Sequence, residues 1–108
     1  SKKTCAKSKF NELYQDYVCS ATIRIARELF AYLPVEHVRV HSMTNILNTS
    51  NGHQEEKCIL SVIFTNSAIL NLDLNKIDPS DSISNFVHNM NFTKMKGFDA
   101  VEKVALTT

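Results

Sequence analysis

Apolar residues recur at spacings of three and four over residues 8–32, and this spacing predicts one long α-helix. The main apolar face of the predicted helix is formed by Phe10, Leu13, Tyr14, Tyr17, Val18, Ala21, Ile25, Leu29 and Tyr32. The opposite, polar stripe contains Glu12, Asp16, Ser20, Arg24 and Arg27. We expect Ser8 to cap the beginning of the helix and Pro34 to end it, because the residue before a proline avoids the helical conformation.

A second group of apolar residues widens the apolar side of this helix. The group consists of Cys19, Ile23, Ala26 and Phe30. Together the two groups present more apolar surface than one small sheet can cover. We therefore expect the surplus, these four side chains, to be buried against a second copy of the chain or a partner domain.

The next segment predicts a β-hairpin. Val38 and Val40 alternate with polar residues, and residues 57–64 form a short, apolar, β-rich run. Between them, Asn51-Gly52 favours a tight type I′ turn that pairs Ser50 with His53. The predicted register places Ile46 opposite Lys57, Thr44 opposite Ile59 and Val40 opposite Ile63, with a bulge near Met43–Asn45.

Residues 65–78 are compatible with a strand or a short helix, and the Ser67-Ala68-Ile69-Leu70 run favours one or two helical turns. Asp78 with Pro79 predicts the beginning of a further helix. Its expected buried face consists of Ile83, Phe86, Val87 and Met90, and the chain is expected to turn at Gly97. Finally, a last strand or a helical turn is expected around Val101, Val104 and Leu106.

These elements predict an α+β fold with two layers. A helix with a wide apolar side must be covered, and two strands alone are marginal without such packing. The simplest arrangement places the long N-terminal helix on one face of a small antiparallel sheet built around the hairpin, with C-terminal helices completing the layer.

Composition narrows the class of protein. The chain has 108 residues, 44% of them hydrophobic and 21% charged, which predicts a single domain over residues 1–108. Because the chain starts with Ser rather than Met, we expect it to be the C-terminal part of a longer protein. No segment has the length or apolarity of a membrane-spanning helix, and no signal-peptide pattern is present. Three widely spaced cysteines, Cys5, Cys19 and Cys58, suit a reducing compartment, so we expect a soluble, cytoplasmic protein.

Net charge argues against a nucleic-acid partner. The total is +1, but four lysines (Lys2, Lys3, Lys7 and Lys9) lie within the first ten residues, which contain no acid. The rest of the chain has 8 basic and 11 acidic residues and therefore lacks the basic surface that duplex binding usually needs.

Glu55-Glu56-Lys57 is the strongest enzymatic signal. An E-x-K pair on a strand faces one way and can bind Mg²⁺ beside a phosphodiester, as in the restriction-nuclease superfamily, which this pattern resembles. That site needs another carboxylate on a preceding strand. The candidate is Glu36, at the opposite end of the hairpin from Glu55, too far away to share one cation.

The sequence does not indicate a histidine metal site or a nucleophilic catalytic residue. His37 and His41 would lie about 13 Å apart on a strand, too far for one ion, and His53 and His88 have no partner placed by sequence. Cys19 and Cys58 are expected in the core, and Ser61 lies in a strand without the turn that exposes a nucleophile. We therefore assign no catalytic, cofactor-binding or metal-binding residue and expect no cofactor.

Four short segments carry a resemblance to a known family: Leu33-Pro34-Val35, residues 58–62, residues 78–81 and Lys96-Gly97-Phe98. With them, residues 8–104 resemble the C-terminal domain of an uncharacterised bacterial family. The resemblance implies a domain that follows a longer N-terminal part, and it implies no activity.

The sequence thus favours a non-catalytic protein-interaction or homo-oligomerisation module of a larger cytoplasmic protein. The partner would dock on the surplus apolar surface of the first helix. The alternative is a metal-dependent nuclease-like or nucleic-acid-binding domain that uses Glu55, Lys57 and the N-terminal lysines.

Overall fold

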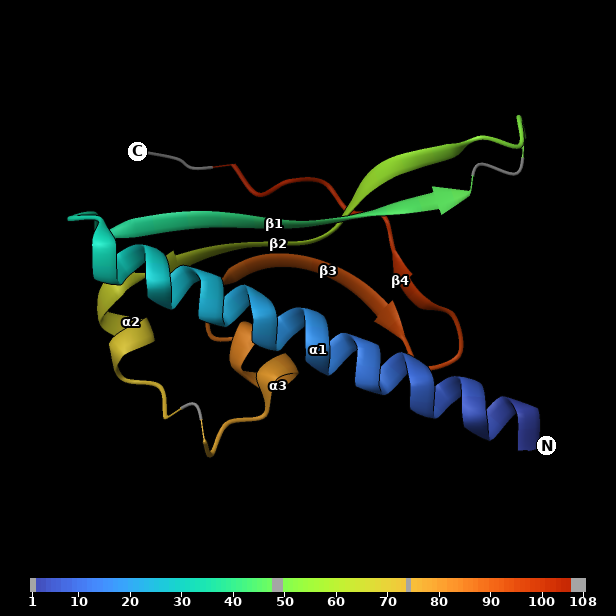
Figure 1. Ribbon diagram of the computed structural model, residues 1–108, viewed down its shortest axis with the longest axis horizontal. Coiled ribbons are helices and arrows are strands. Elements are labelled where there is room, and N and C mark those ends of the chain that lie inside the picture. Colours follow the sequence, from blue (N-terminus) through green and yellow to red (C-terminus); the bar gives the residue numbers. More distant parts are fainter. Residues whose placement is uncertain (1, 48–49, 74, 106–108) are drawn as a thin grey trace.

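The computed structural model describes the backbone of residues 2–47, 50–73 and 75–105, and the side chains of these residues except 2–5 and 47. The elements follow in the order α1 (Lys2–Tyr32), β1 (His37–Leu47), β2 (Gln54–Thr65), α2 (Asn66–Leu70), α3 (Pro79–Ile83), β3 (Val87–Thr93) and β4 (Gly97–Asp99) (Figure 1). The four strands form one antiparallel sheet in the order β1-β2-β3-β4, and α1 lies across one of its faces. The predicted α+β architecture is confirmed.

Helix α1 is unbroken, as the absence of Gly and Pro from its sequence predicts. It ends at Tyr32, two residues before Pro34, and its last turn is extended by a hydrogen bond from the Leu33 N–H to the Leu29 carbonyl. The expected cap at Ser8 is wrong, because the helix already begins at Lys2 and Ser8 lies inside it.

The hairpin of β1 and β2 is present, but its turn differs from the prediction. Leu47 pairs with Gln54, so residues 48–53 form the connection, of which 48–49 lie outside the described residues. Among the described residues of this connection, Gly52 alone has a positive φ, at 74°, whereas a type I′ turn also needs one at Asn51. The side chain of Asn51 instead accepts a hydrogen bond from the His53 N–H at 2.9 Å.

This longer connection changes the register of the whole hairpin. Ile46 pairs with Glu55 and Thr44 with Lys57, two residues away from the predicted partners. A bulge then follows between Ser42 and Met43, one residue before the predicted place. The additional residue of the bulge is Ile59 on β2, which has no direct partner on β1. Beyond the bulge the observed pairing differs from the predicted pairing by one residue instead of two, so that Val40 pairs with Val62.

Helix α2 confirms the preference for a short helix after β2, and helix α3 begins as predicted. Asp78 is the N-cap of α3 and its carboxylate accepts from the Ser80 N–H at 3.1 Å, with Pro79 in the first helical position. The helix ends at Ile83, however, and residues 87–93 form strand β3.

The predicted helical face through Val87 and Met90 is therefore wrong. Strand β2 has an edge that β1 leaves open, and β3 pairs with it, so that Met90 lies opposite Leu60. His88, Met90 and Phe92 are half-buried and Val87, Asn91 and Thr93 are exposed, which is a strand pattern of period two that is interrupted at half-buried Asn89. Ile83 and Phe86 are buried, as predicted.

The main core lies between α1 and the sheet. Helix α1 contributes Val18, Cys19, Ile23, Ala26 and Phe30. The sheet contributes mostly β2 side chains, Ile59, Leu60, Val62 and Phe64, and Ile69, Ile83 and Phe86 close the sides. Phe64 and Phe86 meet edge to face with ring centroids 4.7 Å apart. The Thr22 and Ser42 hydroxyls, 2.9 Å apart, join α1 to β1 within this layer.

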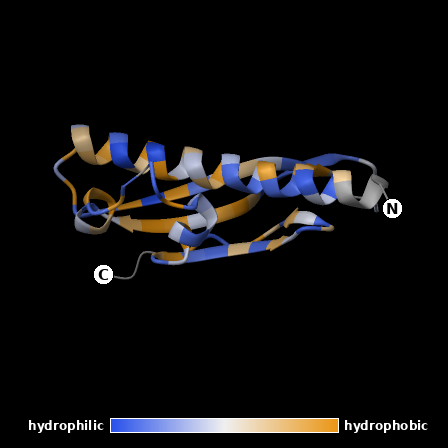
Figure 2. Ribbon diagram, turned by 90° about the horizontal axis from the view of Figure 1, so that it is seen from below, coloured by the Kyte–Doolittle hydropathy of each residue, from blue (hydrophilic) through white to orange (hydrophobic). Residues whose placement is uncertain are grey.

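Residues 100–105 cross the other face of the sheet (Figure 2). The Val101 N–H donates to the Cys58 carbonyl, and the Val104 N–H donates to Ser61 Oγ, both at 2.8 Å. Side chains of Arg39 and Asn89 donate to the carbonyls of Val104 and Glu102. Residues 101–105 form neither the strand nor the helical turn expected there, and Leu106 lies outside the described residues. This segment explains why β2 is buried on both faces.

Candidate interaction surface on the outer face of α1

The face of α1 that does not pack on the main core carries exposed apolar side chains along most of its length. We call this set the outer stripe; it consists of Phe10, Leu13, Tyr14, Tyr17, Ala21, Ile25 and Tyr32. Tyr17 is 70% exposed and Phe10 66%, large values for aromatic side chains. In Figure 2, α1 is the outermost layer on its side of the sheet, and no other described element lies beyond it.

The side of α1 that packs on the sheet was predicted incorrectly. Cys19, Ile23, Ala26 and Phe30, the expected surplus, are core residues of the fold. Of the face expected to pack on the sheet, Val18 is buried and Leu29 is half-buried, but the other seven residues, the outer stripe, are exposed except for half-buried Ala21. A helix with apolar residues all round can pack on either side, and spacing does not distinguish the two.

Side-chain size and polarity explain which side packs inward. Cys19, Thr22 and Ala26 are small, so they let the helix approach the sheet closely. Tyr14, Tyr17 and Tyr32 carry hydroxyl groups that need a hydrogen-bond partner when buried, which water supplies on the outer face. This size difference was available in the sequence and could have identified the packed side.

The middle of the outer stripe is hollowed. A shallow, open hollow is lined by Tyr17, Ser20, Ala21, Arg24 and Ile25. Ser20 and Ala21 have the smallest side chains among the five, and Tyr17, Arg24 and Ile25 have larger ones. The hollow therefore has the shape to receive one bulky side chain from another molecule.

The first half of α1 is held in place by the turn between β3 and β4. The Nζ atom of Lys94 lies 2.9 Å from Glu12 Oε1, and Asn11 Nδ2 donates to the Lys94 carbonyl at 2.7 Å. The hydrogen bond and the positive charge of Lys94 lower the pKa of Glu12. Tyr14 meets Phe98 edge to face with ring centroids 5.7 Å apart. The part of the outer stripe around Tyr14 is thus presented on a segment of the helix that the turn between β3 and β4 holds in place.

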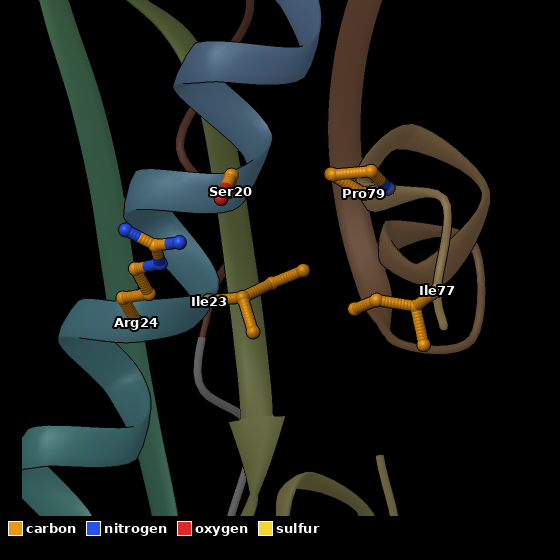
Figure 3. A pocket seen from close by; sticks show the side chains of 5 residues that line it. All are labelled: Ser20, Ile23, Arg24, Ile77 and Pro79. Atoms are coloured by element: carbon orange, nitrogen blue, oxygen red, sulfur yellow. The ribbon is translucent and has the colours of Figure 1, made fainter. Parts of the chain in front are cut away.

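A small cavity separates α1 from the segment that leads into α3 (Figure 3). Ser20, Ile23 and Arg24 line it from the helix, and Ile77 and Pro79 face them from the other side. Its volume of about 30 Å³ is sufficient for a water molecule and too small for an organic ligand.

The candidate nuclease residues do not converge. Glu55 Oε2 and Lys57 Nζ form an ion pair at 3.1 Å, so these side chains lie together as expected. Glu36 precedes β1 and its carbonyl accepts from the Asn66 N–H, at the end of the hairpin remote from Glu55. The ten residues between Glu55 and Asn66 span on the order of 30 Å of strand.

Metal-ligating residues likewise do not gather within the part of the chain that the structure describes, where no three His, Cys, Asp or Glu side chains could hold one ion. His37 and His41 lie on β1, and His53 follows the turn. His88 lies in β3 rather than in a helix, with Nδ1 2.8 Å from the Phe86 carbonyl.

The two described cysteines are buried, as predicted. Burial, together with the nearby carboxylates of Asp16 and Asp78, raises the pKa of the Cys19 thiol to about 12. A thiol with so high a pKa is almost fully protonated at neutral pH and is a poor nucleophile.

One polar pair was missed by the sequence analysis. His41 Nδ1 lies 2.8 Å from Ser61 Oγ, and the two residues are direct partners across β1 and β2. Ser61 is completely buried beneath residues 100–105, so its hydroxyl has no access to a substrate. The correct hairpin register would have revealed the pair, because only that register places the two residues opposite each other.

No helix among the described residues has the length and apolarity needed to cross a membrane. Comparison with protein-family models, with curated proteins and with solved structures finds no match to this chain.

Proposed function

We propose that this chain is a non-catalytic homo-oligomerisation module of a larger cytoplasmic protein, and that the outer stripe of α1 docks against a second copy. The observation that supports the proposal is the combination of size and exposure in this stripe. Leu13 is 58% exposed and Tyr32 84%, in addition to the exposed Phe10 and Tyr17. Monomeric proteins rarely expose contiguous apolar patches larger than a few hundred Å².

The area of the stripe is appropriate for a dimer. A large aromatic side chain buries about 150–250 Å² when fully covered. The exposed fractions of the stripe residues then correspond to an area on the order of 700 Å² per copy, close to the roughly 800 Å² per partner of a standard interface. Tyr is also among the residues enriched at the centres of interfaces. A second copy supplies this area without any further component.

The alternative, a metal-dependent nuclease-like or nucleic-acid-binding domain, has no comparable support. Lys57, the lysine that the nuclease-like site would use, already forms an ion pair with Glu55 of the same site. The resemblance to a bacterial C-terminal domain stays a prediction and is compatible with either function.

The test is the mass of the chain in solution, measured by sedimentation equilibrium or by light scattering over a range of concentrations. We expect a dimer at tens of micromolar. The double variant Leu13→Asp/Tyr17→Asp should be a monomer with an unchanged far-ultraviolet circular dichroism spectrum. Leu70→Asp is the matched control, because Leu70 is 72% exposed on α2, outside the stripe, and this variant should remain dimeric.

A wild-type chain that stays monomeric at all these concentrations would overturn the proposal. So would a dimer that survives the double variant but is lost in Leu70→Asp. Cleavage of DNA with Mg²⁺ or Mn²⁺, or a salt-sensitive shift of DNA by the monomer, would favour the alternative.

A further inference from the structure

The outer stripe contains both a protruding side chain and a hollow, one helical turn apart. Tyr17 protrudes, with 70% of its side chain exposed. Ala21, four residues later on the same face of the helix, is the smallest of the residues that line the hollow. A surface with a bulky group and a matching hollow at neighbouring positions is suited to pack against a copy of itself.

The direction of the second helix decides whether these features meet. In a parallel pair related by a two-fold axis, every residue lies beside its own copy, so Tyr17 meets Tyr17 and the two hollows face each other empty. In an antiparallel pair whose axis passes midway between Tyr17 and Ala21, each Tyr17 enters the hollow over Ala21 of the partner copy. Leu13 then lies opposite Ile25 of the partner copy at both ends of the contact.

Charge favours the same direction. Lys7 and Glu28 are exposed near the two ends of the stripe, and Arg24 is exposed beside the hollow. A parallel pair would align Lys7 with Lys7 and Glu28 with Glu28, which is repulsive. An antiparallel pair brings Glu28 close to Lys7 of the partner copy.

The antiparallel arrangement also gives Arg24 an aromatic partner. It lies opposite Tyr14 of the partner copy, where a guanidinium can stack on the ring. Size and charge therefore select one direction independently of each other.

We propose that two copies of α1 pack antiparallel, about a two-fold axis at the level of Cys19, with Tyr17 of each copy in the Ala21 hollow of the other. This inference rests on the proposed function and specifies its geometry. Antiparallel helices packed side by side have axes about 8–10 Å apart, which is compatible with the small residues at the hollow.

Disulfide trapping tests the direction. Leu13→Cys and Ile25→Cys are made separately in a Cys5→Ser background, in which the native Cys19 and Cys58 are buried. After mixing and mild oxidation, we expect a covalent product that joins the two variants. Either variant alone should give little covalent dimer. In the antiparallel pair the two copies of the same position lie far apart, and a disulfide requires Cα atoms within about 7 Å.

Charge exchange provides a second, independent measurement. Lys7→Glu and Glu28→Lys should each weaken dimerisation by roughly two- to tenfold, and the double variant should recover the wild-type affinity. Arg27→Glu is the control, because Arg27 is exposed away from the stripe and should leave the affinity unchanged.

The outcomes separate the two proposals. A dimer in which Leu13→Cys cross-links to itself would overturn the antiparallel arrangement and leave the proposed function standing. A dimer in which neither the mixture of Leu13→Cys and Ile25→Cys nor either variant alone forms a cross-link would also overturn the antiparallel arrangement. A monomeric wild-type chain would overturn the proposed function itself.

Discussion

The Nδ1 atom of His41 lies 2.8 Å from the Oγ atom of Ser61, on the face of the sheet that residues 100–105 cover. Ser61 Oγ also accepts the hydrogen bond of the Val104 N–H. Because that N–H can only donate, the hydrogen of the Ser61 hydroxyl is available to a neutral His41. The neutral imidazole thus satisfies a completely buried hydroxyl, and through it fixes the C-terminal segment on the sheet.

This pair predicts a pH dependence of stability. Burial lowers the pKa of His41 below its ordinary value of 6.5, and the positive charges of Arg39 and Lys103 lower it further. Between the lowered pKa and 6.5 the unfolded chain binds the proton more strongly, so stability rises with pH in that window. The contribution of neutral His41 to the free energy of unfolding is therefore fully present above about pH 6.5. This contribution is lost as the pH falls toward the lowered pKa of His41 and changes no further below that pKa.

Urea unfolding of the wild type and of His41→Asn, from about pH 5 to about pH 8, measures this contribution. Asn offers a side-chain oxygen near the position of Nδ1 but does not titrate, so the free energy of unfolding should depend less on pH in this variant. His37→Asn, on the same strand and exposed, should retain the wild-type dependence. An identical pH dependence in all three proteins would contradict the assignment.

Ile23 and Ile25 test which side of α1 packs on the sheet. Ile23 is 1% exposed in the core and Ile25 is 49% exposed on the outer stripe, two residues apart on one helix. We expect Ile23→Ala to lower the free energy of unfolding by about 2–5 kcal/mol, because it removes a buried side chain and leaves a cavity.

For Ile25→Ala we expect a change of no more than about 0.5 kcal/mol in the monomer. Urea unfolding at a concentration below that of dimer formation gives both values, and equal losses would mean that the assignment of the two faces is wrong.

The pattern of residues predicted the architecture better than the details of pairing. The unbroken course of α1, its end before Pro34 and the cap at Asp78 depend on neighbouring residues, and these predictions are confirmed, whereas the predicted beginning of α1 at Ser8 is wrong. The hairpin register depends on the turn. Asn51-Gly52 favours a two-residue turn, but the side chain of Asn51 bonds to His53 and the connection is longer.

The helix expected to continue through Val87 and Met90 is wrong for a related reason. The apolar residues of this segment are compatible with a helical spacing and with a strand spacing, and pairing with the open edge of β2, which is remote in the sequence, selects the strand from Val87 onward. The packed side of α1 follows from the size and polarity of its side chains, which the spacing of apolar residues does not express. The candidate surface could be predicted as surplus apolar area on α1, but which residues form it could not be predicted from spacing alone.

Gly97 and Gly52 have similar backbone conformations but different surroundings, so the cost of adding a Cβ can be compared between them. Both have a left-handed φ, 77° and 74°, which costs a residue with a Cβ about 1–2 kcal/mol. A Cβ at Gly52 would meet nothing within 4 Å, whereas one at Gly97 would lie 3.2 Å from the Asn11 side chain. That side chain donates to the Lys94 carbonyl and joins α1 to the turn between β3 and β4.

We therefore expect Gly52→Ala to lower the free energy of unfolding by about 1–2 kcal/mol. Gly97→Ala should cost a further ~1 kcal/mol, because it displaces Asn11 from its hydrogen bond. In an Asn11→Ala background this additional cost should vanish, since no side chain remains to be displaced. Urea unfolding of the four variants measures these differences. If the additional cost of Gly97→Ala persists without the Asn11 side chain, the close contact between them is not its cause.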